Sequence, residues 1–348
     1  MIYKGIVSGL CRCRGLDVIS RTMSSASRPQ VFVSRSDMPE CGIKLLKKEC
    51  DVKLWSDASP VPRAEFLKSV AGVNGIFCSL TDKIDKEILD AAGPNLKVVS
   101  TISVGYDHID VSECTKRGIR IGYTPDVLTD ATAELTVALL LTTSRRLPEA
   151  QHEAKSGGWV SWAPTWMTGP GLAGSTVGIV GFGRIGQAVA RRVKAFSTKK
   201  ILYVNRSERP EAKETGAIKV NFDELLTQSD FVICCAALVP ETKAMFNKEA
   251  FGKMKRSAVF VNTSRGGTVD QDALIEALQN NTIWAAGLDV TTPEPLPLDS
   301  PLFKLKNCVI LPHIGSATIE ARNIMSELTA KNILAAINGK EMPAELKV

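Results

Sequence analysis

The chain has 348 residues, of which 44% are hydrophobic and 23% charged, and its formal net charge is +6. This length allows two domains, and the composition is that of an ordinary globular protein. It contains no run of about 20 apolar residues, so we expect no membrane-spanning segment. It also lacks a basic stripe with interleaved aromatic residues, so we expect no nucleic-acid partner. The nine cysteines lie mostly in strand-like runs without a paired motif, which predicts reduced thiols of an intracellular protein and no metal site.

The N-terminal residues 1–23 differ in composition from the rest of the chain. They are rich in Arg and Ser, almost free of acidic residues, and without the apolar core of a secretory signal. This composition is typical of a mitochondrial transit segment, and Arg21 stands three residues before Ser24, a plausible processing arrangement. The alternative is an untargeted extension with Met23 as a second start. We expect a soluble cytoplasmic protein, with mitochondrial targeting left open.

From Val31 onward, short apolar runs alternate with amphipathic stretches, which predicts parallel βα units. The segment 127–146 is apolar nearly all round, so we expect a buried helix between domains that Thr129 or Asp130 could cap. The irregular stretch 155–175 holds three of the five tryptophans; a packing loop is one interpretation, and a subunit contact is the one we favour. The strands predicted in this half are 31–34, 52–55, 75–80, 97–103 and 119–123.

A second βα series begins at residue 176 and ends with a helix-like stretch, 317–339, that we expect to cross back onto the first series. The pattern therefore predicts an α/β protein with two Rossmann-like, doubly wound parallel-sheet domains and an active-site cleft between them. The strands predicted in this half are 176–181, 200–205, 230–238, 258–264, 285–290 and 308–313.

The segment GFGRIG at 181–186 follows an apolar strand and opens a helix. Gly181 permits a tight turn, Gly183 lets the backbone approach a pyrophosphate, and Gly186 allows close helix–strand packing. The negative pyrophosphate then meets the positive end of the helix. Glycines recur by chance, but this strand–turn–helix context indicates dinucleotide binding. The turn residues that we place at the cofactor are Gly181, Gly183, Arg184, Ile185 and Gly186.

The end of the second strand of this half bears on the choice of cofactor. An acidic residue near this point usually binds the ribose 2′-hydroxyl of NAD, but this chain has Asn205 there, followed by Arg206, Ser207 and Arg209. Guanidinium and hydroxyl groups suit a 2′-phosphate, so we predict NADP(H) in preference to NAD(H). The alternative is that both arginines are solvated and Glu208 contacts the ribose.

The last three predicted strands each end at or before a side chain of a type used in catalysis or substrate binding. Arg265 follows 258–264, Asp289 and Glu294 lie at and after the end of 285–290, and His313 ends 308–313. Each has a plain alternative as a surface turn, a loop charge or a strand end. Together, on the rim of a dinucleotide fold, they suit hydride transfer to a 2-keto acid: His313 donates a proton, a carboxylate favours its charged form, and an arginine binds the substrate carboxylate.

The chain resembles the D-2-hydroxyacid dehydrogenase family over almost its whole length after about Met23. The motifs that carry the resemblance are GFGRIG, NTSRGG, GLDVTTPEP and LPHIGSAT, in the order typical of the family. Within the family it is most similar to the animal branch that reduces glyoxylate and hydroxypyruvate. The resemblance therefore implies NADPH-dependent reduction of glyoxylate to glycolate and of hydroxypyruvate to D-glycerate.

The resemblance also implies roles for individual residues. His313 is the proton donor, Glu294 its partner and Arg265 the ligand of the substrate carboxylate. The family forms homodimers through its nucleotide domain, which gives the tryptophan stretch an interfacial role and lets Trp162 reach the neighbouring pocket. Further residues are implied at the substrate (backbone N–H groups of Val104 and Gly105, and Asp289) and beside the cofactor (Ala237, Thr263, Asp289 and Gly315).

The resemblance implies domain limits and leaves two rivals. Residues 24–126 and 319–348 form a discontinuous substrate-binding domain, and residues 127–318 form the dinucleotide-binding domain. One rival is an enzyme of the 3-phosphoglycerate type, which would want basic residues for a phosphate and often has a C-terminal regulatory domain. The other is a dinucleotide-sensing, corepressor-like binding module with a long tail; only a short stretch follows His313 here.

Overall fold

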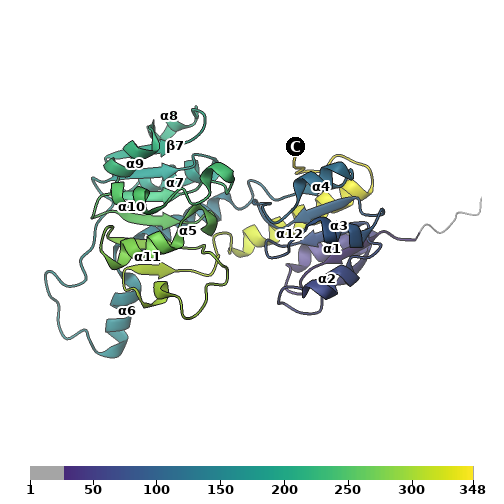
Figure 1. Ribbon diagram of the computed structural model, residues 1–348, viewed down its shortest axis with the longest axis horizontal. Coiled ribbons are helices and arrows are strands. Elements are labelled where there is room, and N and C mark those ends of the chain that lie inside the picture. The colour runs from purple at the N-terminus through teal and green to yellow at the C-terminus, as the bar shows by residue number, and fades with distance from the viewer. Residues whose placement is uncertain (1–26, 348) are drawn as a thin grey trace, which may run out of the picture.

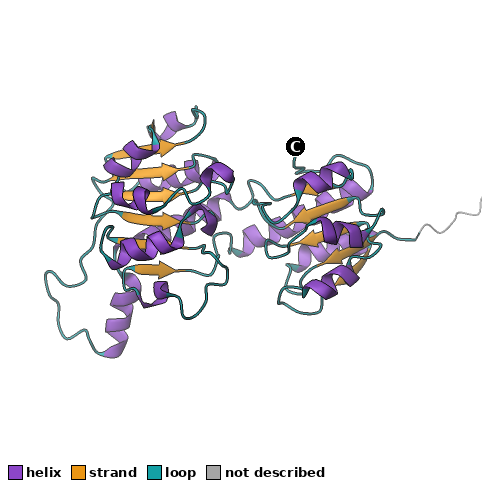
Figure 2. Ribbon diagram, in the orientation of Figure 1, coloured by secondary structure: helices purple, strands orange, loops and turns teal. Residues whose placement is uncertain are grey.

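Two parallel sheets organise the chain (Figures 1 and 2). The computed structural model describes residues 27–347, and the predicted transit segment 1–23 lies outside the described residues. We call the body around the five-stranded sheet the small body and that around the seven-stranded sheet the large body. The prediction of two doubly wound α/β bodies is confirmed.

The small body has the strand order β2-β1-β3-β4-β5, with every pair parallel. Its central strands are buried throughout, because helices cover both faces, and this is why they read as continuous apolar runs. The C-terminal helix α12 crosses back as predicted and lies against α1 and the sheet. The elements are β1 (Gln30–Val33), α1 (Glu40–Glu49), β2 (Asp51–Leu54), α2 (Arg63–Ser69), β3 (Gly75–Cys78), α3 (Lys86–Ala92), β4 (Val98–Thr101), α4 (Val111–Lys116), β5 (Arg120–Gly122) and α12 (Ile319–Ile337).

The large body has the strand order β12-β11-β10-β9-β6-β7-β8, also parallel. The order reverses between β6 and β9, and such a switch point is where ligands bind in open parallel sheets. The elements are α5 (Thr129–Ser144), α6 (Leu147–Ser156), β6 (Thr176–Val180), α7 (Arg184–Lys194), β7 (Lys200–Val204), α8 (Ala212–Thr215), β8 (Ile218–Lys219), α9 (Phe222–Gln228), β9 (Phe231–Cys234), α10 (Lys248–Lys253), β10 (Val259–Asn262), α11 (Gln271–Gln279), β11 (Ala285–Leu288) and β12 (Cys308–Ile310), with 3-10 turns at Pro240–Thr242, Gly266–Thr268 and Pro301–Lys304.

Helix α5 joins the two bodies. Leu128 and Ala131, at its start, belong to the small body's core, while Leu139 and Leu140 belong to the core of the large body, so the prediction of an interdomain helix is confirmed. The predicted cap is wrong. Leu128 occupies the N-cap position without a side-chain bond, because the helix already begins at Thr129.

Helix α6 and the stretch after it extend away from the large body (Figure 1). No residue of α6 is buried, and Trp162 is 82% exposed. Trp159 and Val160 beside it are exposed as well. These apolar side chains therefore have little contact with their own chain, which counts against an internal packing role for this part of the stretch. Leu172, near its end, is buried in the large body's core.

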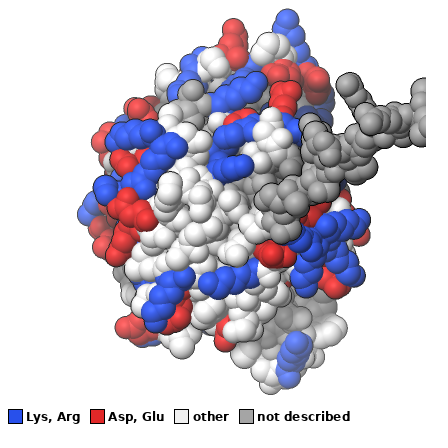
Figure 3. Space-filling view, turned by 90° about the vertical axis from the view of Figure 1, so that its right-hand side faces the viewer, with Lys and Arg blue, Asp and Glu red and all other residues white. Residues whose placement is uncertain are grey.

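The outer surface of the small body carries both signs of charge. Figure 3 shows Lys, Arg, Asp and Glu side chains interspersed around a central area of uncharged residues. No helix among the described residues is long and apolar enough to cross a membrane. The described cysteines are all unpaired, and four of them, Cys50, Cys78, Cys114 and Cys234, are buried.

Candidate active site

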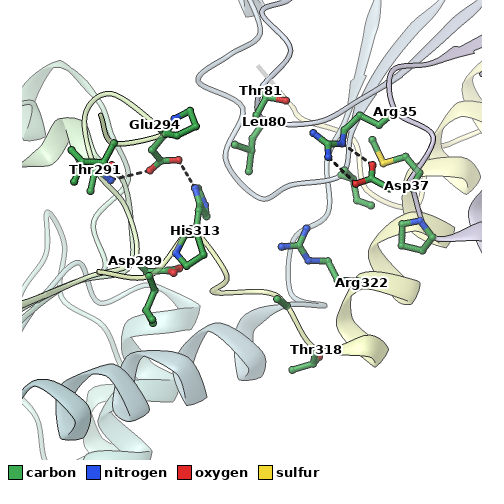
Figure 4. A pocket seen from close by; sticks show the side chains of 18 of the residues that line it. Arg35, Asp37, Leu80, Thr81, Asp289, Thr291, Glu294, His313, Thr318 and Arg322 are labelled. Carbon is green, nitrogen blue, oxygen red and sulfur yellow. Dashed lines mark hydrogen bonds and ion pairs between the residues drawn. The ribbon is translucent and has the colours of Figure 1, made fainter. Parts of the chain in front are cut away.

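Two adjoining cavities lie between the small and large bodies, beyond the strand ends of both sheets. The larger has a volume of about 910 Å³ and the smaller about 430 Å³. Figure 4 shows side chains of the large body on one side of the larger cavity and side chains of the small body opposite them. The residues that line both cavities are Leu80, Ile102, Asp289, His313 and Arg322.

His313 and Glu294 form a hydrogen-bonded pair on the large body's side of the cleft (Figure 4). Nδ1 of His313 lies 2.8 Å from Oε2 of Glu294, and Oε1 of Glu294 accepts a bond from the Thr291 amide at 3.0 Å. Burial raises the pKa of Glu294, but His313, the Thr291 amide and Arg265 together hold it below the ordinary glutamate value. The carboxylate is therefore charged, and it leaves Nε2 as the histidine nitrogen available to a substrate.

Asp289 holds the backbone of the loop that carries His313. Its two carboxylate oxygens accept bonds from the amides of Ile314 and Gly315, both at 2.8 Å, and its carbonyl accepts from the His313 amide at 2.9 Å. His313 has a φ of 55°, a left-handed conformation that these bonds maintain. Burial raises the pKa of Asp289 despite the two amides. Asp289 therefore holds the backbone of His313 in the orientation that points its ring into the cleft. It also lines both cavities.

Arg265 reaches across the cleft from the end of β10 to the small body. Its Nε–H donates to Oδ1 of Asp107 at 3.0 Å, and its NH1 group donates to the carbonyl of Ser264 at 2.8 Å. Val104 and Gly105, after β4, lie in the same cavity, and neither amide makes a hydrogen bond among the described residues. An arginine and two free amides therefore converge where a carboxylate could bind.

The glycine turn between β6 and α7 is shaped as the sequence predicts. Gly181 has a φ of 91°, and a Cβ there would lie 2.6 Å from the Ala236 nitrogen. A Cβ at Gly186 would lie 2.2 Å from the Gly181 oxygen, so this position requires close backbone packing. At Gly183 nothing lies within 4 Å of an added Cβ, which leaves open space at the helix start for a phosphate group.

The remaining predicted cofactor residues fall into three places. Ile185, Ala237, Thr263 and Gly315 line the smaller cavity, and Arg184, the first residue of α7, pairs with Asp126. Asn205 follows β7 and accepts a bond from the Phe182 amide, so it borders the glycine turn. Arg206 and Ser207 are exposed, while Nε of the half-buried Arg209 is shielded from solvent without a partner among the described residues.

Some residues that line the cavities were not predicted. Those of the small body include Leu80 and Arg322, which border both cavities, Arg35, which borders the larger one, and Asp107, which borders the smaller. Arg35 is paired with Asp37, at 2.8 Å. Arg322 projects toward His313 in Figure 4 and comes from the start of α12. Arg35, Leu80 and Asp107 follow the ends of β1, β3 and β4, so the strand-end rule applied to this body as well would have indicated them. Trp162 was predicted at the neighbouring subunit's pocket, and it lines neither cavity of its own chain.

Comparison with known proteins gives consistent matches. Residues 137–315 match the model of the D-isomer specific 2-hydroxyacid dehydrogenase family, NAD binding domain. The chain is 56% identical to the glyoxylate reductase/hydroxypyruvate reductase of Homo sapiens over 92% of this chain and 98% of that protein. It is 48% identical to the glyoxylate reductase of Thermococcus kodakarensis over 91% of this chain and 95% of that protein.

A solved structure adds a bound cofactor to these matches. The NADPH-dependent glyoxylate/hydroxypyruvate reductase of Sinorhizobium meliloti, in complex with NADP and malonate, aligns with a TM-score of 0.79. It is 33% identical in sequence, and the alignment covers 92% of this chain and 97% of that chain. The match spans both bodies of the fold.

Proposed function

Because the chain belongs to the D-isomer specific 2-hydroxyacid dehydrogenases, we propose that it reduces glyoxylate to glycolate and hydroxypyruvate to D-glycerate with NADPH. The observation that carries the proposal is the His313–Glu294 pair, 2.8 Å apart, in the same cleft as Arg265 and the unbonded amides after β4. An acid, an anion site and a dinucleotide turn are the parts that this reduction needs.

The substrate is held at its carboxylate. Arg265 donates from the large body, and the amides of Val104 and Gly105 donate from the small body. These three donors fix the carboxylate, and with it the neighbouring keto group, between the two bodies. It also makes productive binding depend on closure of the cleft, which excludes water from the reacting groups.

His313 completes the reaction with a proton. The reduced nicotinamide, when bound, supplies the hydride to the keto carbon. His313 delivers the proton from Nε2 to the keto oxygen, which becomes the new hydroxyl group. The charged Glu294 stabilises the protonated imidazole before transfer, and Asp289 keeps the ring's loop in position.

The groups on the chain fit NADP(H) as the preferred cofactor. Gly183 offers open space at the start of α7 for the pyrophosphate, and Asn205 replaces the carboxylate that would repel a 2′-phosphate. Arg206, Ser207 and Arg209 lie just beyond it, and Nε of Arg209 has no partner among the described residues. NAD(H), which lacks the phosphate, remains a second and poorer cofactor.

The working unit in this proposal is a homodimer. The stretch 157–171 presents Trp159, Val160 and Trp162 to solvent, and α6 before it has no buried residue. Exposed tryptophans on an extended arm are typical of a surface that a partner covers. In the dimer, Trp162 reaches the neighbouring subunit's cleft. Two measurements on Trp162→Ala test this. Size-exclusion chromatography with light scattering should give an unchanged dimer mass, while steady-state turnover should fall.

Targeting through residues 1–23 is also part of the proposal. Their composition suits mitochondrial import, and the rival is translation from Met23. Fusing residues 1–23 to a fluorescent protein tests it directly. Mitochondrial fluorescence supports the proposal, and diffuse fluorescence equal to that of the unfused protein contradicts it.

A substrate panel tests the proposed function. We expect rapid NADPH oxidation with glyoxylate and hydroxypyruvate, and slower oxidation with NADH. A preference for the 3-phosphate of hydroxypyruvate would favour the phosphoglycerate-type enzyme, which the comparisons do not favour. Intact NADPH binding without oxidation on any 2-keto acid would favour the nucleotide sensor.

A further inference from the structure

An ion pair between Asp107 and Arg265 joins the two bodies at the substrate site. Asp107 lies in the loop after β4, and Arg265 follows β10, 158 residues further along the chain. Their Oδ1 and Nε atoms are 3.0 Å apart, and the side chains are 40% and 22% exposed. Both residues line the smaller cavity, so this pair belongs to the cleft rather than to the outer surface.

The loop that carries Asp107 is firmly placed. The next residue, His108, is half-buried, and its Nε2 lies 3.0 Å from Oγ1 of Thr101, at the end of β4. Burial lowers the pKa of His108 to about 4, so the ring is neutral at physiological pH. The carboxylate of Asp107 is charged, because Arg265 outweighs the effect of burial and lowers its pKa. A fixed anion therefore faces the guanidinium.

The donors of Arg265 are divided between the two bodies. A guanidinium has N–H groups on Nε, NH1 and NH2. The Nε–H donates to Asp107 in the small body, and NH1 donates to the Ser264 carbonyl in the large body. No hydrogen bond to NH2 is found among the described residues, so that nitrogen keeps its donors for another acceptor.

The free NH2 group lies directly over Gly105. A Cβ at Gly105 would come within 1.6 Å of NH2 and 3.0 Å of Oδ1 of Asp107. Only a residue without a side chain leaves room for this ion pair beside the loop backbone. The unbonded Gly105 amide and the unbonded NH2 group therefore lie next to each other, as a carboxylate ligand requires.

We propose that Asp107 is the positioning residue for Arg265, and that it directs the guanidinium's NH2 edge toward the substrate carboxylate only when the cleft is closed. The inference deepens the proposed function and rests on it. Asp107 accepts from Nε, which fixes the rotation of the guanidinium about its last bond. Because Asp107 and Arg265 belong to different bodies, opening the cleft breaks this bond and releases the arginine.

The position of Asp107 also has an unfavourable electrostatic effect on the substrate, and this effect distinguishes the variants expected below. A charged Asp107 near the carboxylate site repels the substrate, so its benefit must come from orienting Arg265. Asp107→Asn keeps an oxygen acceptor and removes the repulsion, whereas Asp107→Ala removes both. A role in orientation therefore predicts that the asparagine variant recovers activity that the alanine variant loses.

Steady-state kinetics with NADPH and either keto acid test the proposal. We expect Asp107→Ala to lower kcat/KM about 10- to 30-fold, mainly through a higher KM, as misplaced binding groups do. For Asp107→Asn, the fall in the logarithm of kcat/KM should be less than half of the fall seen with Asp107→Ala. Asp90→Ala is the matched control, because Asp90 pairs with Arg117 at 2.7 Å on the small body outside both cavities.

A double-mutant cycle excludes a merely structural role. If Asp107 acts through Arg265, adding Asp107→Ala to Arg265→Ala should change kcat/KM by less than about 2-fold, because the group to be oriented is gone. Equal losses in both backgrounds, or no loss in Asp107→Ala alone, would overturn the proposal. Failure of the wild-type chain to reduce either acid would instead overturn the proposed function, and the same cycle then runs on whichever 2-keto acid it does reduce.

Discussion

The two sides of the cleft differ in how their polar groups are engaged. On the large body's side, His313 is bonded to Glu294, and Asp289 is bonded to the loop of His313, so the catalytic side is complete within one body. On the small body's side, the amides of Val104 and Gly105 make no hydrogen bond among the described residues. Chemistry is therefore preassembled on one side, and recognition on the other side waits for the substrate. Changes on the first side should lower kcat, and changes on the second should raise KM.

The largest effect is expected at His313. Replacing it with alanine removes the proton donor but leaves the glycine turn and its cavity intact. Turnover should fall by about 10²–10⁴-fold, the usual contribution of a general acid, while NADPH affinity stays unchanged. Stopped-flow oxidation of NADPH and a fluorescence titration measure the two quantities. Unchanged turnover would contradict the division between the two sides.

Arg265 joins the two sides, so its loss should show as weaker substrate binding. Arg265→Ala removes a charged partner of the substrate carboxylate and leaves Asp107 unpaired. We expect kcat/KM to fall about 10²-fold, since truncating one member of a charged pair costs several kcal/mol. Arg117→Ala, which removes an arginine outside both cavities, is the control. A loss confined to kcat would place Arg265 with the chemistry instead.

A substitution at Gly183 should change cofactor affinity without changing the stability of the fold. An added Cβ meets nothing within 4 Å in the folded chain, so Gly183→Ala should leave the Tm nearly unchanged. The same methyl group would stand where a pyrophosphate approaches the backbone, so the Kd for NADPH should rise about 10-fold. Gly252→Ala, which also meets nothing, is the control. An unaltered Kd would exclude the glycine turn as the phosphate site.

The smallest effect is expected on cofactor choice. Arg209→Ala should lower the preference for NADPH over NADH by about 3- to 5-fold, because one phosphate ligand among several is lost. Ratios of kcat/KM for the two cofactors measure it, with Lys213→Ala as a control cation on the same body. A drop with NADH as large as that with NADPH would show a structural role for Arg209.

The contrast between the two sides also explains what the sequence could predict. His313, Glu294 and Arg265 follow predicted strands, and the parallel-sheet rule places all such ends on one edge. The spacing of the glycines likewise predicts the turn. The small strand β8 was missed, because its two residues are exposed and have no apolar run. Arg322 was missed because it lies on α12, away from any strand end, and its position depends on how the two bodies face each other. Asp107 was missed although it follows β4, because only the structure shows its contact with Arg265 across the cleft.

The pair of His313 and Glu294 is the centre of the proposed mechanism, and pH dependence tests it most directly. The pKa of Glu294 is lowered in the folded chain, so its charge and the stability it contributes are present above the ordinary value, about 4.3, and are lost only as pH falls through the lowered value. Glu294→Gln keeps the contact with Nδ1 of His313 but removes its charge, so the alkaline limb of the kcat/KM profile for hydroxypyruvate should move to lower pH. A limb that stays in place, with wild-type turnover, would contradict the assignment of this pair as the proton donor and its stabiliser.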